Sequence, residues 1–412
     1  MQAARNPRRM RWLRLAGSVA VVLFLLGCRG QDFPPPPAPP PPSLPQTAWP
    51  AFADDLDRAS LQKALQASLA YLQRLPADRL LPLGDRQIPV ARLVDTLVAF
   101  ARLLAQAPTP AALAKQLPTH FELVQAAGHD GQGEVLFTGY YEPILPGSLV
   151  PTPEFTYPLY GRPPDLLQLD LGAFHPRFAG EQIVARLHDG KLLPYFTRRD
   201  IDAGGKLRGQ GLELVWLRDA VDGFILHLQG SGQIRLRDGR HLRVHYAASN
   251  GHPYRSLGEL LRIRDDLPPE ALTLQGLRRY LRAHPQEQEL ILHYNPRYVF
   301  FRFVDEGPLG NLGIPLVPGR SIALDQRLFP PAGLAFIDTQ QPRLDAQGTV
   351  TGWQPLRRFV FTHDTGGAIT GPGRADLFWG SGEAAEAIAG RWRQPGRLFF
   401  LLLRQPRTAA RG

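Results

Sequence analysis

Residues 363–380 constrain the fold of this chain more than any other stretch, because residues 366–373 within them include five that break regular structure. These are Gly366, Gly367, Gly371, Pro372 and Gly373. Neither a helix nor a long regular strand tolerates that density of glycine and proline. The apolar run 359–361 before them predicts a short strand, and a second apolar run, 377–379, follows. We therefore predict an irregular glycine loop between two apolar segments.

Two carboxylates, Asp364 and Asp376, bracket this glycine loop. A carboxyl group beside an aromatic run is partly desolvated, and desolvation raises its pKa. An acid that stays protonated near neutral pH can act as a general acid. Taken by itself, the loop is equally open to a second interpretation, a turn with two solvated aspartates.

The chain has 412 residues, which is enough for two domains with separate cores, and its 41 prolines and 40 glycines indicate many turns. Leucines at helical spacing predict helices between residues 51 and about 125. From Gly133 onward, short apolar runs between turn residues predict strands. Residues 212–217 and 224–228 are predicted as two of these strands, with a turn at 230–232. The pattern predicts a mainly β chain with barrel-like domains behind an N-terminal helical segment.

The formal net charge of +10 allows an anionic polymer or membrane surface as a partner. The basic residues are mostly arginines interspersed with acids, and no nucleic-acid-binding motif is present, so we do not expect nucleic acid as a partner. A single cysteine excludes an intrachain disulfide and a cysteine-based metal cluster.

The position of that cysteine, Cys28, is informative. Five arginines between Arg5 and Arg14 precede an apolar run, 15–27, which is too short to span a bilayer. The leader resembles a bacterial lipoprotein signal, in which cleavage leaves a lipid-modified cysteine at the N-terminus. Arg29 after the cysteine favours the outer membrane, by the sorting rule for such lipoproteins. The proline-rich residues 31–50 predict an extended tether.

Several other chemistries find no support in the sequence. The glycine loop lacks the lysine and hydroxyl residue of a phosphate-binding loop. His241 and His245 have the spacing of metal ligands, but the residues around them predict a strand and no third ligand is evident. Ser231 lies between two glycines without the pattern of a nucleophile elbow, so we interpret it as a binding or turn residue.

Polar residues beside glycines are suited to bind the hydroxyl and acetamido groups of sugars. Four of them are candidates for glycan contact: Thr138, Tyr140, Gln229 and Ser231. For each residue taken alone, a polar turn is the alternative.

Five segments, taken in order, resemble the family of membrane-bound lytic murein transglycosylase A, MltA. They are residues 137–143, 228–232, 249–258, 295–301 and 364–380, and the resemblance extends from about Gly133 to Leu403. It implies a double-psi β-barrel interrupted by a second, smaller β-domain, with a groove between them. The expected limits are a signal peptide at 1–27, a lipidated cysteine and tether at 28–50, and the helices plus the first part of the barrel at 51–150. The inserted domain is expected at 151–293 and the second part of the barrel, the 3D domain, at 294–405.

The resemblance also implies an activity: cleavage of the β-1,4 bond between N-acetylmuramic acid and N-acetylglucosamine in peptidoglycan glycan strands. No water is consumed, and a 1,6-anhydromuramoyl end results. The single catalytic residue maps onto Asp376, and the three aspartates that name the 3D domain map onto Asp325, Asp364 and Asp376. We expect Asp325 and Asp364 to be supporting residues. Thr370 stands where many relatives carry lysine, which removes a charged contact from this loop.

Neither the residues nor the resemblance calls for a cofactor or a metal. The expected location is the periplasmic face of the outer membrane, with cell-wall synthesis complexes as partners to be tested. Two other functions remain open at this stage. One is a lipid-anchored, non-catalytic peptidoglycan-binding protein. The other is a hydrolase with two carboxylates, Asp364 and Asp376, because glycoside hydrolases place a pair of carboxylates around the bond.

Overall fold

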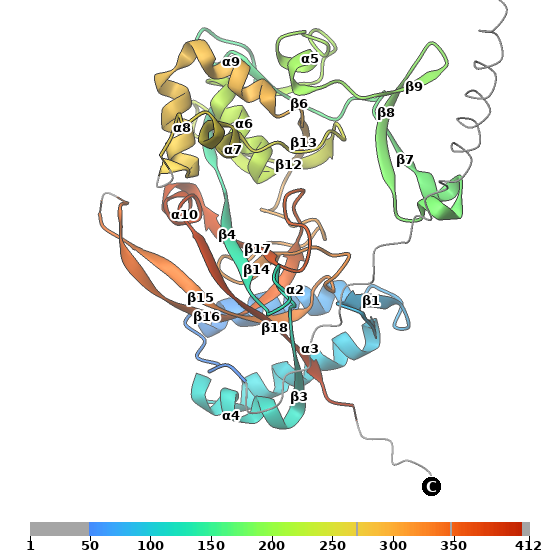
Figure 1. Cartoon of the computed structure of the whole chain (residues 1–412), viewed down its shortest axis with the longest axis vertical. Helices are drawn as coiled ribbons and strands as arrows, with labels where there is room; N and C mark the ends of the chain where they lie inside the picture. The colour runs from blue at the N-terminus through green and yellow to red at the C-terminus, as the bar shows by residue number, and fades with distance from the viewer. Residues whose placement is uncertain (1–48, 269–270, 347, 406–412) are drawn as a thin grey trace, which may run out of the picture. The chain divides into compact units, whose positions relative to one another are not determined.

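The computed structural model describes residues 49–268, 271–346 and 348–405, so the predicted signal peptide, Cys28 and nearly all of the tether lie outside the described residues (Figure 1). The chain enters the fold as a helical layer. Its helices are α2 (Arg58–Leu72), α3 (Val90–Gln106) and α4 (Pro110–His120). Asp57 and Thr109 cap the N-termini of α2 and α4 with their side-chain oxygens. The leucine stripes of α2 and α3 are buried, which confirms the predicted helical spacing.

The helical layer also contains strands that the sequence did not predict. A hairpin of β1 (Leu80–Leu83) and β2 (Arg86–Pro89) separates α2 from α3, and β3 (Phe121–Gln125) follows α4. Gly84 makes the hairpin turn in the left-handed region, with φ of 64°. The prediction of helices between residues 51 and about 125 missed these strands, because strands of four or five residues are too short to show a period of two.

Six strands close into a barrel, which confirms the predicted fold class. They are β4 (Val135–Glu142), β14 (Ser321–Ala323), β15 (Leu334–Leu344), β16 (Val350–Asp364), β17 (Arg374–Ser381) and β18 (Arg393–Leu403). Their order is β15-β16-β14-β17-β4-β18, and β18 pairs with β15 to complete the ring. The pairs β14–β16 and β17–β4 are parallel, and β3 adds to the outer edge of β18. Helix α10 (Gly382–Ala389) connects β17 to β18.

Between β4 and β14 the chain forms a second β-rich body (Figure 1). Its six-stranded sheet has the order β13-β12-β11-β5-β10-β6. The strands are β5 (Ile144–Ser148), β6 (Tyr157–Tyr160), β10 (Glu213–Leu217), β11 (Ser231–Arg235), β12 (His241–Ser249) and β13 (Val299–Val304). A separate three-stranded arm consists of β7 (Leu167–Asp170), β8 (Gln182–His188) and β9 (Lys191–Pro194).

Helices cover this second sheet. They are α5 (Arg198–Asp202), α6 (Ala220–Gln229), α7 (Leu257–Ile263), α8 (Leu274–Ala283) and α9 (Pro285–Tyr294). The predicted strand at 224–228 is wrong, because these residues belong to α6. Asp219 caps the helix and Gly230 ends it in the left-handed region, with φ of 75°. Residues 221–227 of this helix are all buried, so their periodicity could not distinguish a helix from a strand. The predicted turn at 230–232 is the end of this helix followed by the start of β11.

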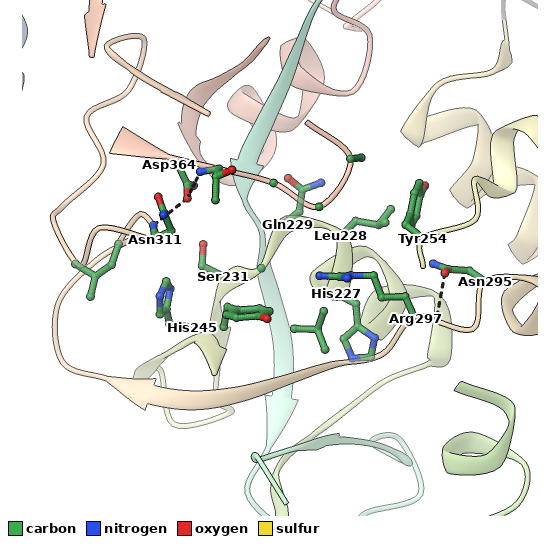
Figure 2. Close-up of a pocket in the computed structure, with 18 of the residues that line it drawn as sticks. His227, Leu228, Gln229, Ser231, His245, Tyr254, Asn295, Arg297, Asn311 and Asp364 are labelled. Carbon is green, nitrogen blue, oxygen red and sulfur yellow. Dashed lines mark hydrogen bonds between the residues drawn. The ribbon is translucent and has the colours of Figure 1, made fainter. Parts of the chain in front are cut away.

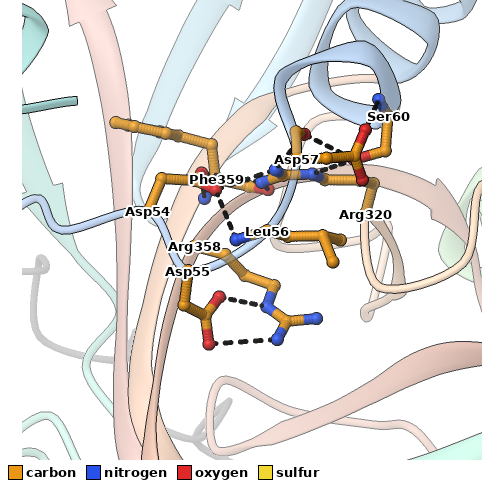
Figure 3. A network of polar contacts seen from close by, with 8 residues as sticks. All are labelled: Asp54, Asp55, Leu56, Asp57, Ser60, Arg320, Arg358 and Phe359. Carbon is orange, nitrogen blue, oxygen red and sulfur yellow. Dashed lines mark hydrogen bonds and ion pairs between the residues drawn. The ribbon is translucent and has the colours of Figure 1, made fainter. Parts of the chain in front are cut away.

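A buried ion pair fastens the start of the described chain to the barrel (Figure 3). The Arg320 guanidinium binds both carboxylate oxygens of Asp54, each at 2.7 Å, and is fully buried. It also donates to the carbonyls of Asp57 and Phe359 and to the hydroxyl of Ser60. Because every donor of this arginine is used, the network fixes the first turn of α2 against the β14–β16 region.

Candidate active site

The strand register brings the two aspartates of the glycine loop onto one row of the barrel. Ala323 of β14 pairs with Asp364 on one side and with Asp376 on the other. Asp376 in turn pairs with Thr138 of β4. Neighbouring strands lie about 4.8 Å apart, so the Cα atoms of the two aspartates are separated by about 10 Å. Paired residues point to the same face of a sheet, so both carboxylates belong to one site.

The carboxylate of Asp376 is held at one oxygen only. Thr138 donates a hydrogen bond of 2.8 Å from its hydroxyl to Oδ1 of Asp376, and no other residue that the structure describes donates to this carboxylate. Arg374 donates to the Thr138 oxygen at 3.3 Å, which leaves the threonine hydrogen to point at Asp376. Burial raises the pKa of Asp376 to about 6, the Thr138 hydrogen bond and the Arg374 charge oppose that rise, and the charge of Asp364 adds to it.

Asp364 has a different environment, because both of its oxygens accept hydrogen bonds. The backbone N–H groups of Asn311 and Thr365 donate to Oδ1, each at 2.9 Å, and the Tyr140 hydroxyl donates to Oδ2 at 2.9 Å. Burial raises the pKa of Asp364 to about 6 against these three donors, all of which favour the anion. The donors make Asp364 the more suitable of the two carboxylates to carry the negative charge, and that charge favours a proton on Asp376.

Tyr140 lies between the two acids. Burial, and then the nearby charge of Asp364, raise the pKa of the Tyr140 hydroxyl well above its ordinary value. The phenol therefore stays protonated and remains a donor to Asp364. Its ring packs against Phe378 with centroids 5.3 Å apart, which fixes its orientation. Thus two residues predicted to contact glycan, Thr138 and Tyr140, each donate a hydrogen bond to one of the carboxylates.

Asp325 anchors the glycine loop. It is buried, forms an ion pair with Arg327 at 2.7 Å, and accepts the backbone N–H of Gly371 at 2.8 Å. Burial opposes its ionisation, but the hydrogen bonds from Arg327 and Gly371 prevail and lower the pKa of Asp325. Gly371 has φ of 80°, a conformation that most other residues avoid. Asp325 is therefore an ionised loop anchor, not a proton donor.

A cavity of about 390 Å³ lies where the glycine loop faces α6, β11, β12 and β13 (Figure 2). Asp364, Gln229 and Ser231 line it, whereas Asp376 is not among the lining residues and pairs with Ala323 on the same row as Asp364. Gln229 accepts the backbone N–H of Tyr141 at 3.0 Å, so its oxygen is used within the protein. The cavity brings together residues of the second, third, fourth and fifth of the five motif segments, which are far apart in the sequence.

The cavity lining also includes residues for which no binding or catalytic role was predicted. Examples are Arg297, Asn311, Tyr254 and His245. Arg297 belongs to the segment 295–301, so its place in a motif was a signal, whereas nothing in the sequence marked Asn311. His241 and His245 lie on β12, which confirms the predicted strand histidines. No group of three histidine, cysteine or acidic side chains in the described part of the chain could hold a metal ion.

Two family models match this chain. One, the MltA specific insert domain, covers residues 136–302, and the other, the 3D domain, covers residues 320–402. Among curated proteins, membrane-bound lytic murein transglycosylase A of Vibrio cholerae is 33% identical over 308 residues, 74% of this chain and 74% of the relative. The protein of that name from Escherichia coli K12 is 32% identical over 280 residues, 67% of this chain and 68% of the relative.

Solved structures show the same relationship. The membrane-bound lytic murein transglycosylase of Agrobacterium tumefaciens superposes with a TM-score of 0.72 at 31% identity, covering 88% of this chain and 97% of that one. E. coli MltA with bound chitohexaose superposes with a TM-score of 0.69 at 25% identity, covering 89% and 95%. Together with the barrel and its pair of carboxylates, these similarities define an enzyme of the lytic transglycosylase class. The chain belongs to the lytic murein transglycosylase A family.

Within the described residues, no helix combines the length and the apolar character that crossing a membrane requires.

Proposed function

We propose that this chain cleaves the β-1,4 bond between N-acetylmuramic acid and N-acetylglucosamine in peptidoglycan, without water, and that Asp376 serves first as acid and then as base. The observation that carries the proposal is the contrast between the two carboxylates. Burial raises the pKa of both to about 6, but Asp376 has one hydroxyl donor, whereas Asp364 has three donors that favour its anion. The relatives are named murein transglycosylases, which indicates peptidoglycan as the polymer that is cleaved. The solved structure of E. coli MltA contains a bound oligosaccharide, chitohexaose.

The reaction proceeds in two proton transfers. The protonated Oδ2 of Asp376 gives its proton to the glycosidic oxygen while the bond from that oxygen to C1 of muramic acid breaks. The resulting Asp376 carboxylate accepts the proton of the C6 hydroxyl, and O6 forms a bond to C1, which closes the anhydro ring. Asp376 ends the cycle protonated again, so one carboxyl group suffices.

Supporting residues set the state of that carboxyl group. Thr138 holds Oδ1, so Oδ2 is the oxygen left for the proton. The negative charge of Asp364 raises the pKa of Asp376, and it also stabilises the positive charge that develops at C1. Gln229 and Ser231, which line the cavity, are the proposed contacts to the glycan.

A two-carboxylate hydrolase is the alternative to be separated by experiment, because inverting hydrolases place their carboxyl groups about 6.5–9.5 Å apart. Against it, both oxygens of Asp364 are occupied by donors, which leaves this carboxylate poorly placed to activate a water molecule. The test is a digestion of purified sacculi with the parent chain, Asp376→Asn and Asp364→Asn, analysed by mass spectrometry. Asp189→Asn, at an exposed turn of the arm, is the matched control.

We expect the parent to release fragments with anhydro ends, each lighter by one water than a reducing end, and Asp376→Asn to release none. Asp364→Asn should retain anhydro chemistry at a reduced rate. Reducing ends from the parent would identify a hydrolase instead. If neither the parent nor any variant released soluble fragments, while every one of these proteins bound to the sacculi, the chain would be a non-catalytic binding protein.

We also propose that Cys28 is lipid-modified and anchors the enzyme to the outer membrane, where its polymer lies. Support comes from the basic and apolar leader that ends at this cysteine and from the membrane-bound relatives. Cys28→Ala should abolish metabolic labelling with a fatty acid and remove the protein from the outer-membrane fraction. Unchanged labelling would disprove the anchor. Any cell-wall synthesis complex that binds the enzyme would then be sought by cross-linking in that membrane fraction.

A further inference from the structure

The cavity next to the row of Asp364, Ala323 and Asp376 has an end that the proposed reaction does not use. Figure 2 draws Asp364 and Asn311 on one side of the cavity, and Arg297, Tyr254 and Asn295 on the other. Asp364 is the one carboxylate among the described residues that line the cavity. The far end is therefore positively charged.

The backbone of Arg297 is held firmly. Asn295 is buried, and its side-chain oxygen accepts the N–H of Arg297 at 3.1 Å. The carbonyl of Arg297 accepts a hydrogen bond of 2.9 Å from Arg198, a fully buried residue of α5. Arg198 has its own partners, the carboxylate of Asp202 at 3.6 Å and Nδ1 of His227 at 2.8 Å. Its charge is thus compensated within the protein.

The guanidinium of Arg297 has no such compensation. No carboxylate in the described part of the chain lies within ion-pair distance of it, and no acceptor there receives its hydrogen bonds. The group lies against the glycine loop, because a Cβ added to Gly367 would come within 3.3 Å of Nη2. Gly367 thus lets the cation reach over the loop into the cavity. It is three residues from Asp364, at most about 11 Å along an extended chain.

We propose that Arg297 binds a carboxylate of the stem peptide attached to muramic acid, and so makes peptide-bearing glycan a better substrate than bare glycan. The inference rests on the proposed function. A planar guanidinium with unused donors is matched to a carboxylate, which it can bind through two parallel hydrogen bonds. In the intact strand the lactyl carboxyl of muramic acid is taken up in the amide bond to the stem peptide, so the anionic groups of the strand belong to the peptides. The neighbouring Tyr254 and Asn295 complete a partly enclosed end, in which salt screens such a pair only in part.

The test compares two substrates, intact sacculi and the same sacculi after an amidase has removed the stem peptides. The amidase leaves a free lactyl carboxylate on each muramic acid, so the comparison separates a contact to the peptide from a contact to the sugar's own carboxylate. The variants are Arg297→Gln, which removes the charge, and Arg297→Lys, which keeps the charge but not the paired donors. Arg343→Gln is the matched control, because Arg343 is exposed on β15, far along the chain from the cavity lining, and also has no ion pair in the described structure. The readout is kcat/KM for each substrate and the ratio of the two values.

We expect Arg297→Gln to lower the ratio of intact to peptide-free activity about tenfold, since a hydrogen-bonded charge contact is commonly worth that factor or more. Arg297→Lys should lose part of the ratio, and Arg343→Gln should leave both activities unchanged. Raising the salt concentration should reduce the ratio for the parent and hardly affect that of Arg297→Gln. An equal loss on both substrates, or no loss on either, would overturn the proposal.

A binding measurement separates this inference from the proposed reaction. In an Asp376→Asn background, pelleting with intact and peptide-free sacculi reports affinity without cleavage. Weaker binding of Arg297→Gln to intact sacculi alone would support the contact even if the parent produced reducing ends and the proposed reaction failed. Equal binding of both Arg297 forms to both polymers would refute the contact even if anhydro ends were found.

Discussion

Replacing Asp376 by asparagine should make the protein more stable at neutral pH while it abolishes cleavage. Burial raises the pKa of Asp376 from 3.8 to about 6, so the folded protein binds this proton more tightly than the unfolded chain does. Below pH 4 the carboxyl group is protonated in both the folded and the unfolded state, and it does not change the free energy of unfolding. As the pH rises from about 4 to about 6 the unfolded chain loses the proton more readily, so the free energy of unfolding falls over this range. Asparagine has no charge to bury and removes this pH-dependent loss.

The magnitude follows from the size of the shift. About two pK units at about 1.36 kcal/mol per unit set an upper limit of about 3 kcal/mol. Asp376 is partly accessible to solvent, so screening brings the expected gain to about 1–3 kcal/mol above pH 7. The gain should decline below pH 6 and vanish near pH 4.

The assay is thermal unfolding of the parent, Asp376→Asn and the control Asp189→Asn between pH 4 and pH 8. The melting temperature of Asp376→Asn should exceed that of the parent at pH 8 and match it at pH 4, whereas the control should follow the parent throughout. In parallel, kcat/KM of the parent should fall tenfold per pH unit above about pH 6, because only the protonated acid starts the reaction. A variant that is no more stable than the parent at pH 8 would refute the reasoning that Asp376 is a desolvated acid.

Three further changes test the surrounding structure. Thr138→Val removes the hydrogen bond that lowers the pKa of Asp376, so the alkaline limb of the pH–rate profile should move to higher pH; an unmoved limb would contradict the contact. Asp54→Asn leaves the buried Arg320 charge uncompensated and should lower the free energy of unfolding by about 3–5 kcal/mol, measured in urea, whereas a loss below 1 kcal/mol would mean that solvent reaches the pair. Gly373→Ala would place a Cβ 2.4 Å from a backbone nitrogen of the neighbouring loop, so both the melting temperature and the activity should fall, and an unchanged melting temperature would show that the loop moves aside at no cost.

Local sequence patterns predicted much of the fold and the identity of the acids. The leucine stripes of α2 and α3 have a period that only an amphipathic helix satisfies, and the structure buries them as expected. The glycine loop with Asp364 and Asp376 stood out because glycine and proline restrict the backbone independently of the rest of the chain. The prediction failed where an apolar run had no clear period, as in α6, whose residues 221–227 are all buried.

The arrangement of the site depended on tertiary structure. Residues of one type, such as Asp325, Asp364 and Asp376, carry no sequence signal that separates a loop anchor from a charged partner or an acid. Barrel closure made the distinction. In the folded barrel Asp325 accepts the N–H of Gly371 and forms an ion pair with Arg327. Asp364 accepts three hydrogen bonds, and Asp376 accepts one from the described residues.

The sequence by itself determined which segments are helix, strand or loop where their pattern is strong, and which residues have the chemistry of an acid. Only the tertiary structure decided how those residues share protons and charge. The reason is physical: a pKa depends on burial and on neighbours, and here the neighbours are separated by tens to hundreds of residues, as Thr138 and Asp376 are. The same holds for Arg297, whose uncompensated charge is evident only in the folded structure, where no acid among the described residues forms an ion pair with it.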